Sequence, residues 1–357
     1  MDQNHVIAIN PGSTSTKVAV YENKRIIFSK NIIHSTDELS NFPSITEQYT
    51  YRKELIFNEI RAINLDENSV GAVVGRGGLI RPITSGVYSV NEKMITDLRN
   101  NILGEHASNL GGLIAYELAR LLPNAKAYIA DPIVVDEMQD VARICGHPLF
   151  ERISIFHALN HKAVGKQYAN SLGIEYKKLN LIIAHLGGGI TIGAHKKGKV
   201  IDVNNGLDGE GPFSPERSGT LPIGALVRLC FSGTYTYKEI KQMIKGKGGY
   251  VAHLNTNNGR EVENNASKGD KKSILIQKAM GYQIGKYIGS MATVLEGKVD
   301  AIILTGGLAH NRDLTNYIKN MVAFIAPVIL YPGEDEMYAL AMSGQMVLQN
   351  KLKPKVY

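Results

Sequence analysis

The feature that most constrains the fold of this chain is a pattern of strands and loops that occurs twice. Residues 5–28 read as apolar strands separated by turns, in the order HVIAIN, PGSTST, KVAVYE and NKRIIF. Residues 180–203 repeat that order as NLIIAHL, GGG, ITIGAH, KKG and KVIDV. Apolar runs of this length between small residues are typical of buried strands joined by tight turns. The repetition indicates an internal duplication and predicts two domains of mixed α/β class, each opening on one copy.

The length of the chain also favours two domains. One hydrophobic core rarely organises as many as 357 residues. The boundary is expected near residues 145–155, which gives a first domain at 1–148 and a second at 149–335. A ligand is expected where the two repeated loops would face each other.

Helices are expected where apolar residues recur at spacings of three and four. Four stretches have this spacing: 51–63, 107–122, 160–172 and 273–296. In the last of them Gly281, Gly285 and Gly289 also lie four apart. We interpret these glycines as positions where another backbone packs closely, rather than as ligand contacts.

Composition excludes several classes of protein. The chain is 44% hydrophobic and 20% charged, and its net charge of +7 comes from scattered basic residues with no stripe that would bind nucleic acid. Cys145 and Cys230 lack zinc-site spacing, and so few cysteines fit a reducing compartment. The longest uncharged apolar run, 321–330, is interrupted by Pro327, and the first residues lack a signal pattern. We expect a cytoplasmic protein with neither a nucleic acid nor a membrane partner.

The first repeated loop, NPGSTSTK at residues 10–17, carries groups that can bind phosphate. Small residues let backbone N–H groups and the hydroxyls of Ser13 and Ser15 approach phosphate oxygens, and Lys17 adds a positive charge. Asn10, at the strand end, is placed to hold a water of a magnesium ion. The alternative is an ordinary hairpin turn rich in serine and threonine.

Two further loops have glycines at the end of an apolar strand. Gly187, Gly188 and Gly189 follow one strand, where bare backbone can approach phosphate or simply pack tightly. The segment ILTGGLAHN at 303–311 ends a third strand and enters a helix, so that a nucleoside could lie over its backbone. Three such strand ends in one chain favour a nucleotide, because its phosphates and its base need separate binding loops. The predicted nucleotide contacts in the last segment are Gly306, Gly307 and Asn311.

These loops belong to a wider resemblance, to the acetate and butyrate kinase family within the superfamily of actin, sugar kinases and Hsp70. It runs over nearly the whole chain, through INPGSTSTKVAV, VVGRGGL, GEHASNLGG, ADPIVVDEM, FHALNHKAVG, AHLGGGITIGAH, GEGPFSPERSGTLP and LTGGLAHN in that order. The motifs NPGSTSTK, GRGGL and GPFSPERSG are more similar to butyrate and branched-chain fatty acid kinases than to acetate kinases. The resemblance implies two actin-like (ribonuclease H-like) domains, each a five-stranded mixed sheet flanked by helices, with an ATP cleft between them. It also implies that a C-terminal helix, 336–357, packs back on the first domain.

The resemblance implies catalytic residues whose chemistry suits transfer of the γ-phosphoryl group to a carboxylate. The attacking oxygen is already anionic, so the reaction needs relief of repulsion between anions rather than a general base. Arg217 in PERSG matches the family arginine that contacts the transferring group, and its planar fork suits phosphoryl oxygens. His157 matches the histidine that donates a hydrogen bond to that group, and Asp131 matches an acidic residue near magnesium. Glu336 matches the C-terminal glutamate that orders the water shell of the metal, with an ordinary helix N-terminus as the alternative.

The substrate carboxylate is expected on Arg76 of GRGG, with His106 and Asn109 facing the same region. Acetate kinases carry this arginine a few residues earlier on the strand. They also carry an asparagine where this chain has Gly188, so backbone contacts must replace that side chain.

The implied reaction is butanoate plus ATP giving butanoyl phosphate plus ADP, by direct in-line transfer with Mg²⁺. Isobutyrate, isovalerate, propionate or acetate stay open as acceptors, because one methylene in an apolar pocket changes discrimination by only ~1 to 3 kcal/mol. A non-catalytic actin-like nucleotide-binding module is the alternative from another class, and a sugar kinase would need a positioned base. The resemblance further implies a homodimer or a higher homo-oligomer.

Overall fold

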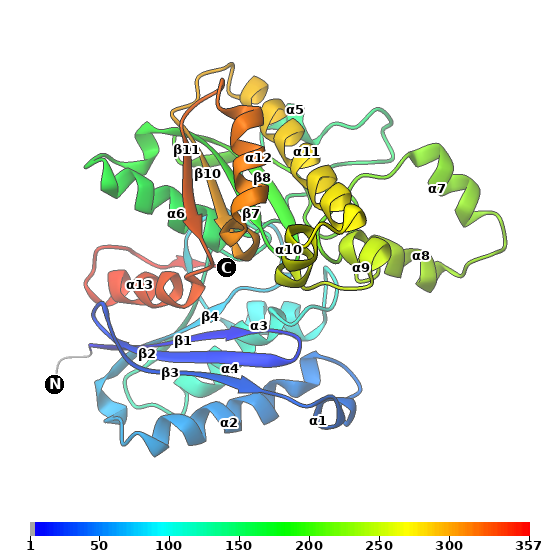
Figure 1. Cartoon of the computed structure of the whole chain (residues 1–357). Coiled ribbons are helices and arrows are strands. Elements are labelled where there is room, and N and C mark those ends of the chain that lie inside the picture. Colours follow the sequence, from blue (N-terminus) through cyan, green and yellow to red (C-terminus); the bar gives the residue numbers. More distant parts are fainter. Residues whose placement is uncertain (1–3) are drawn as a thin grey trace. The chain divides into compact units, whose positions relative to one another are not determined.

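The computed structural model describes residues 4–357, which form two compact units. The first unit comprises residues 4–135 and 335–357, and the second comprises residues 136–334 (Figure 1). The first unit thus ends before the boundary expected at residue 148. The residues in between join the second unit because the Gln139 N–H donates to the Ile201 carbonyl (3.0 Å) and Arg152 Nη1 donates to the Ala142 carbonyl (2.8 Å).

The first unit is built on a seven-stranded mixed sheet with the order β12-β5-β6-β4-β1-β2-β3. Strand β1 runs antiparallel to β2 and parallel to β4, and β2 pairs antiparallel with β3. Strands β1 and β4 are buried over most of their length, as expected for near-continuous apolar runs at the centre of a sheet. The strands are His5–Pro11 (β1), Ser15–Glu22 (β2), Arg25–Ile33 (β3), Val70–Arg76 (β4), Val87–Ser89 (β5), Lys126–Ala130 (β6) and Lys355–Val356 (β12).

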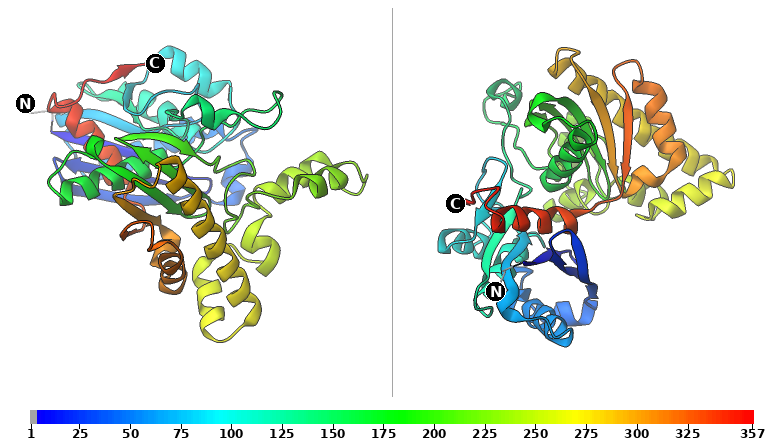
Figure 2. Two further views of the ribbon diagram at one scale, coloured as in Figure 1. Left: turned by 90° about the horizontal axis from the view of Figure 1, so that it is seen from above. Right: turned by 90° about the vertical axis from the view of Figure 1, so that its left-hand side faces the viewer.

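Helices pack on both faces of this sheet. Successive side chains of β1 and β4 point to opposite faces and are apolar on both, so each face needs a cover. Ile7 and Val73 face a core shared with α2 and α4, whereas Val6 and Val74 face α13. At Gly344 of α13 an added Cβ would lie 2.7 Å from the Val6 side chain, so the helix lies directly against β1, as Figure 2 shows. The helices are Thr36–Ser40 (α1), Tyr49–Ala62 (α2), Glu92–Arg99 (α3), Asn109–Ala119 (α4) and Glu336–Leu348 (α13), with 3-10 turns at Thr46–Gln48 (η1) and Glu67–Ser69 (η2).

Two expectations for this unit need correction. The sheet has seven strands rather than five, because β5 and β12 are only three and two residues long and carry no readable alternation. The C-terminal helix does not extend over 336–357. It ends at Leu348, just before Asn350 adopts a left-handed backbone (φ 56°), and the chain then returns as β12 beside β5.

The second unit has a five-stranded mixed sheet, β11-β10-β7-β8-β9, as predicted. Strand β7 runs antiparallel to β8 and parallel to β10, which repeats the pairing of β1 with β2 and β4. The two copies in the sequence therefore fold alike, and the predicted two-domain α/β fold is confirmed. The strands are Asn180–Leu186 (β7), Ile190–Lys196 (β8), Lys199–Val203 (β9), Ala301–Gly306 (β10) and Val328–Pro332 (β11).

The helices of the second unit also pack on both faces of their sheet. One core joins β7, β8 and β10 to α11 and α12, and a second joins β7 and β10 to α6. Two of the three glycines on α11 serve this packing, against side chains rather than backbone: a Cβ at Gly281 would lie 2.8 Å from Tyr317 and one at Gly285 would lie 2.8 Å from Met321, both on α12. The expectation is wrong for Gly289, where a Cβ would meet nothing within 4 Å. The helices are Asp140–Arg143 (α5), Ala158–Ser171 (α6), Ile223–Cys230 (α7), Tyr237–Ile244 (α8), Gly249–Leu254 (α9), Gly259–Ser267 (α10), Lys271–Val294 (α11) and Arg312–Val322 (α12), with 3-10 turns at Tyr176–Lys178 (η3) and Gly307–His310 (η4).

Candidate active site

Three predicted site residues contact one another in the first unit, and we call Asn10, Arg76 and Glu336 the triad. They lie near the end of β1, at the end of β4 and at the start of α13. Glu336 Oε2 accepts a hydrogen bond from Asn10 Nδ2 (2.6 Å) and pairs with Arg76 Nη1 (3.0 Å), which also donates to Asn10 Oδ1 (3.3 Å). The Glu336 side chain is only 4% exposed. The guanidinium of Arg76 therefore compensates a buried carboxylate.

Arg76 uses only one nitrogen in the triad. Within residues 4–357 its Nη2 and Nε make no hydrogen bond, and the side chain is 20% exposed. A guanidinium carries five N–H donors in a planar fork. The Nη2 and Nε edge can accordingly bind a second carboxylate through two parallel hydrogen bonds.

The glycines around Arg76 are explained by the contact between β4 and α4. A Cβ at Gly75 would lie 2.0 Å from the Gly111 carbonyl oxygen, and a Cβ at Gly111 would lie 2.1 Å from the Arg76 carbonyl oxygen. The two backbones therefore touch, which only glycine permits. This contact fixes the position from which Arg76 extends.

His106 stands on the loop before α4, and Asn109 is the first residue of that helix. The Asn109 side chain is fully buried and bonds only within the protein: its Oδ1 accepts from the Leu79 N–H (2.8 Å), and its Nδ2 donates to Asn101 Oδ1 (2.9 Å) and the Gly104 carbonyl (3.1 Å). It therefore braces the loop after Arg76. His106 Nδ1 accepts from the Ser108 N–H (3.2 Å), which leaves the ring proton on Nε2.

Asp131 adopts an unusual backbone conformation directly after β6. Its φ is +37°, in the left-handed region, and its side chain is 7% exposed. One carboxylate oxygen, Oδ1, accepts from Ser85 Oγ (2.6 Å) and from the Gly86 N–H (2.8 Å). These bonds hold the carboxylate in a strained turn, a common feature of functional positions.

The first loop is held from inside by Arg52 of α2. This fully buried guanidinium donates to the carbonyl oxygens of Gly12 (2.7 Å), Ser13 (2.9 Å) and Ser15 (3.2 Å), and burial lowers its pKa to about 10. Ser13 and Lys17 are exposed, and Ser15 is half-buried. The sequence carried a signal for Arg52, which lies four residues before Ile56 and eight before Ile60 on the buried face of α2.

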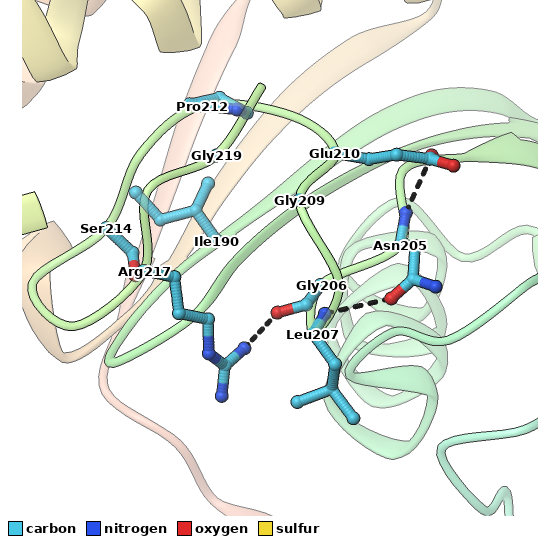
Figure 3. Close-up of a pocket in the computed structure, with 10 residues that line it drawn as sticks. All are labelled: Ile190, Asn205, Gly206, Leu207, Gly209, Glu210, Pro212, Ser214, Arg217 and Gly219. Atoms are coloured by element: carbon cyan, nitrogen blue, oxygen red, sulfur yellow. Dashed lines mark hydrogen bonds between the residues drawn. The ribbon is translucent and has the colours of Figure 1, made fainter. Parts of the chain in front are cut away.

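Arg217 lies in a pocket of the second unit, with its guanidinium directed at the loop around Gly206 (Figure 3). Its Nη1 donates to the Gly206 carbonyl, and burial lowers its pKa. No carboxylate forms an ion pair with it in the described part of the chain. A Cβ at Gly189 would lie 1.8 Å from Arg217 Nη1. Gly189 is thus needed to make room for the arginine, whose half-buried cation could receive an anionic ligand.

The other glycines of the two nucleotide loops divide into two kinds. A Cβ at Gly187 would lie 2.8 Å from His185 Nε2, and one at Gly306 (φ +88°) would lie 2.5 Å from the Leu186 carbonyl oxygen, so both are required by packing. A Cβ at Gly188 or Gly307 would meet nothing within 4 Å. Gly188 and Gly307 are therefore the positions with open space beside the backbone.

Asn311 has a structural use that its motif did not reveal. Its Oδ1 accepts from the Leu314 N–H (2.9 Å) and so caps α12, and its Nδ2 donates to Gln277 Oε1 (3.0 Å). The side chain is 4% exposed. It fixes the start of the helix that follows Gly306 and Gly307.

His157 immediately precedes α6 and lies against the end of β7 and the start of β8. Its Nδ1 is 2.9 Å from Thr191 Oγ1, and its ring stacks on that of His185 with centroids 3.8 Å apart and an interplanar angle of 13°. His185 Nδ1 lies 2.8 Å from Asn160 Oδ1, and its Nε2 lies 3.0 Å from Glu334 Oε1. The contacts on Nδ1 and on the ring face together restrict the orientation of the His157 imidazole.

Comparison with known proteins places this geometry in a family. A sequence model of the Acetokinase family matches residues 151–325. Butyrate kinase 2 and butyrate kinase 1 of Clostridium acetobutylicum are 55% and 53% identical to the chain, each over 99% of both sequences. The chain belongs to the acetokinase family. Porphyromonas gingivalis acetate kinase has the same fold, with a TM-score of 0.81 and 22% identity over 97% of this chain and 100% of its own.

Membership of the acetokinase family confirms the class of reaction implied by the motifs. The chain is a phosphotransferase that uses ATP and a carboxyl group as acceptor, and its substrates are ATP and a short-chain acid. It is therefore not a nucleotide-binding module without catalysis. Within residues 4–357, no helix combines the length and the hydrophobicity that crossing a membrane requires.

Asn10 and Glu336 are the residues predicted to lie at a metal ion. Among the described residues, no group of three or more histidine, cysteine or acidic side chains could hold a metal. The carboxylate of Glu336 and the amide of Asn10 are oxygen donors suited to Mg²⁺, but Glu336 Oε2 is already bonded to Asn10 and Arg76. These residues fit contact with a hydrated Mg²⁺ that is carried mainly by phosphate oxygens.

Proposed function

We propose that the chain phosphorylates butanoate with ATP to give butanoyl phosphate and ADP. The proposal depends most on the match to two butyrate kinases at 55% and 53% identity over 99% of the chain. It is supported by the half-buried Arg217, which has no carboxylate partner in the described second unit, and by a triad in the first unit that leaves one guanidinium edge for a carboxylate.

In this proposal Arg76 binds and orients the acceptor. Its Nη2 and Nε atoms would donate hydrogen bonds to the two carboxylate oxygens of butanoate. Its Nη1 would stay paired with Glu336 Oε2, at 3.0 Å. The buried Glu336 carboxylate and Asn10 fix the guanidinium plane. Asn109 acts through the loop that it braces, and His106 and Asp131 line the same unit.

Arg217 and His157 act on the transferring phosphoryl group. Negative charge spreads over three equatorial oxygens as the γ-phosphoryl group moves, and a preorganised cation stabilises that charge most effectively where water is excluded. Arg217 is half-buried and already oriented by the Gly206 carbonyl. His157 would donate a hydrogen bond from Nε2, because its Nδ1 faces Thr191.

The remaining groups hold ATP and Mg²⁺. We propose that backbone N–H groups at Gly188 and Gly307 contact the nucleotide, because no side chain would meet a Cβ there. Ser13, Ser15 and Lys17 complete the phosphate contacts from a loop that Arg52 holds rigid. Mg²⁺ supplies charge neutralisation at the β- and γ-phosphates, with Asn10 and Glu336 ordering its water shell. We also propose a cytoplasmic homodimer or higher homo-oligomer.

The acyl preference tests this function. Initial rates should be measured with acetate, propanoate, butanoate, isobutyrate and pentanoate at saturating ATP and Mg²⁺. We expect the highest kcat/KM for butanoate, with propanoate lower by about 10- to 200-fold and acetate lower still, because each methylene contributes ~1 to 3 kcal/mol in an apolar pocket. An optimum at two carbons would contradict the butanoate assignment and leave the carboxylate kinase reaction intact.

A further inference from the structure

A continuous line of hydrogen-bonding side chains runs through the second unit and ends on His157. Tyr176 Oη lies 2.5 Å from His195 Nδ1, and His195 Nε2 lies 3.1 Å from His161 Nδ1. His161 Nε2 lies 3.0 Å from Thr191 Oγ1, which in turn lies 2.9 Å from His157 Nδ1. We call Tyr176, His195, His161 and Thr191 the relay.

The local folds of β8 and α6 place the relay. Thr191, Gly193 and His195 alternate along β8 and so share one face of the sheet, while His157 and His161 are one helical turn apart at the start of α6. Gly193 lies between them, where a Cβ would lie 3.4 Å from both His161 Nδ1 and His195 Nε2. A larger residue would separate the two imidazoles.

The two imidazoles in the middle of the relay are neutral. His161 and His195 are fully buried, and burial lowers the pKa of each well below its ordinary value. Neighbouring cations add to this effect: the buried ammonium of Lys162 lowers the pKa of both rings. A neutral imidazole has one N–H donor and one lone pair, so it must donate on one side and accept on the other.

This restriction gives the line from Tyr176 to Thr191 one of two directions, and the direction continues to His157 when the Thr191 O–H lies along the line instead of Oγ1 accepting from both imidazoles. Thr191 has a single O–H, which it can donate to His157 or to His161 but not to both. If Tyr176 donates to His195, each imidazole carries its proton on Nε2 and Thr191 donates to His157 Nδ1. If the direction is reversed, all three imidazoles carry their proton on Nδ1 and His157 Nε2 becomes an acceptor.

The chemistry of Tyr176 favours the direction in which its hydroxyl donates to His195. A phenol is a stronger acid than a neutral imidazole, so Tyr176 is the better donor of the pair with His195. The Lys162 ammonium lies 5.9 Å from the centroid of the Tyr176 ring, but it is paired with Glu137 (2.5 Å), so the direction rests on the acidity of the phenol. The Nε2–H tautomer is also the one that a histidine side chain prefers in water.

We propose that the relay holds His157 in the tautomer with its proton on Nε2, so that His157 donates, rather than accepts, a hydrogen bond at the transferring phosphoryl group. The role of His157 in this statement rests on the proposed function. No proton moves along the relay in the reaction, because the attacking carboxylate is already an anion. Tyr176, His195, His161 and Thr191 are therefore positioning residues.

The first test reads the tautomers directly, in the wild-type protein without substrates. Two-bond ¹H–¹⁵N correlation spectra of protein labelled with ¹⁵N-histidine distinguish Nε2–H from Nδ1–H, and single His→Gln variants assign the signals. We expect His157, His161 and His195 all to carry the proton on Nε2. A proton on Nδ1 of any of the three would overturn the relay, whether or not the protein phosphorylates butanoate.

The second test measures turnover in variants of Thr191. Thr191→Val keeps the shape and removes the hydroxyl, and we expect kcat to fall about tenfold with little change in the KM of ATP or butanoate, as for loss of one hydrogen bond. Thr191→Ser, which keeps the hydroxyl, should restore most of the turnover. Thr315→Val is the matched control, since this buried hydroxyl bonds only to carbonyls of its own helix. Full turnover in Thr191→Val, or equal loss in Thr191→Ser, would contradict the proposal.

Discussion

Replacing Arg217 by alanine should lower kcat by about a thousandfold and leave the Kd of ATP within about threefold of the wild-type value. The guanidinium is half-buried, has no carboxylate partner in the described second unit and is oriented by the Gly206 carbonyl. Such a cation stabilises charge that develops only in the transition state, so its loss affects turnover rather than nucleotide binding. Isothermal titration with ATP and steady-state assays with butanoate measure the two quantities separately.

Two further variants sharpen this prediction. One separates the charge of Arg217 from its planar shape, and the other is a control at an exposed arginine. Arg217→Lys keeps the charge without the planar fork, and we expect it to recover only part of the activity. Arg228→Ala, on the exposed side of α7, is the control and should turn over normally. Wild-type kcat in Arg217→Ala, with thermal unfolding unchanged, would remove Arg217 from the mechanism.

Replacing Arg76 by alanine should raise the KM of butanoate and lower kcat/KM for butanoate by roughly a hundredfold, while the KM of ATP changes little. Loss of a bidentate contact to a carboxylate accounts for about 2–5 kcal/mol where the pair is shielded from water. The variant also leaves Glu336 buried without its cation, so the protein should unfold at a lower temperature. Kinetics at varied butanoate and at varied ATP distinguish the two substrates.

A second substitution separates the effect of the positive charge of Arg76 from the effect of its planar guanidinium. Arg76→Lys can keep the ion pair with Glu336 but cannot offer a second planar edge, so we expect stability to return and the KM of butanoate to stay high. Arg81→Ala is the control in the same unit, because Arg81 is 59% exposed and pairs with Asp97. A wild-type KM for butanoate in both Arg76 variants would mean that the carboxylate binds elsewhere.

Much of the fold could be predicted because its signals are local and periodic. The duplicated strand pattern led directly to the matching pairing of β1 with β2 and β7 with β8, and the spacing of apolar residues located α2, α4, α6 and α11. The two edge strands of the first sheet could not be predicted. Strand β12 has two residues, and it exists only because β5, far away in the chain, offers it a partner.

The sequence predicted which residues belong to the candidate site, but not which other residues their side chains contact. Motifs identified Arg217 and Gly189, yet only coordinates show that the glycine makes room for the arginine. The motifs predict ligand contacts for Asn109 and Asn311, and the coordinates add that their amides also bond to the protein. Arg52 and Thr191 carried only weak signals, a four-residue spacing and an alternation along β8, because their roles depend on contacts with segments distant in sequence.

Formation of a mixed anhydride tests the central claim most directly. The purified protein should be incubated with butanoate, ATP and Mg²⁺ in the presence of hydroxylamine, which traps acyl phosphates as hydroxamates. We predict butanoyl hydroxamate in amounts equal to the ADP produced, and none when butanoate or ATP is omitted. Release of ADP without hydroxamate, or no ADP at all, would contradict transfer of the phosphoryl group to this carboxylate.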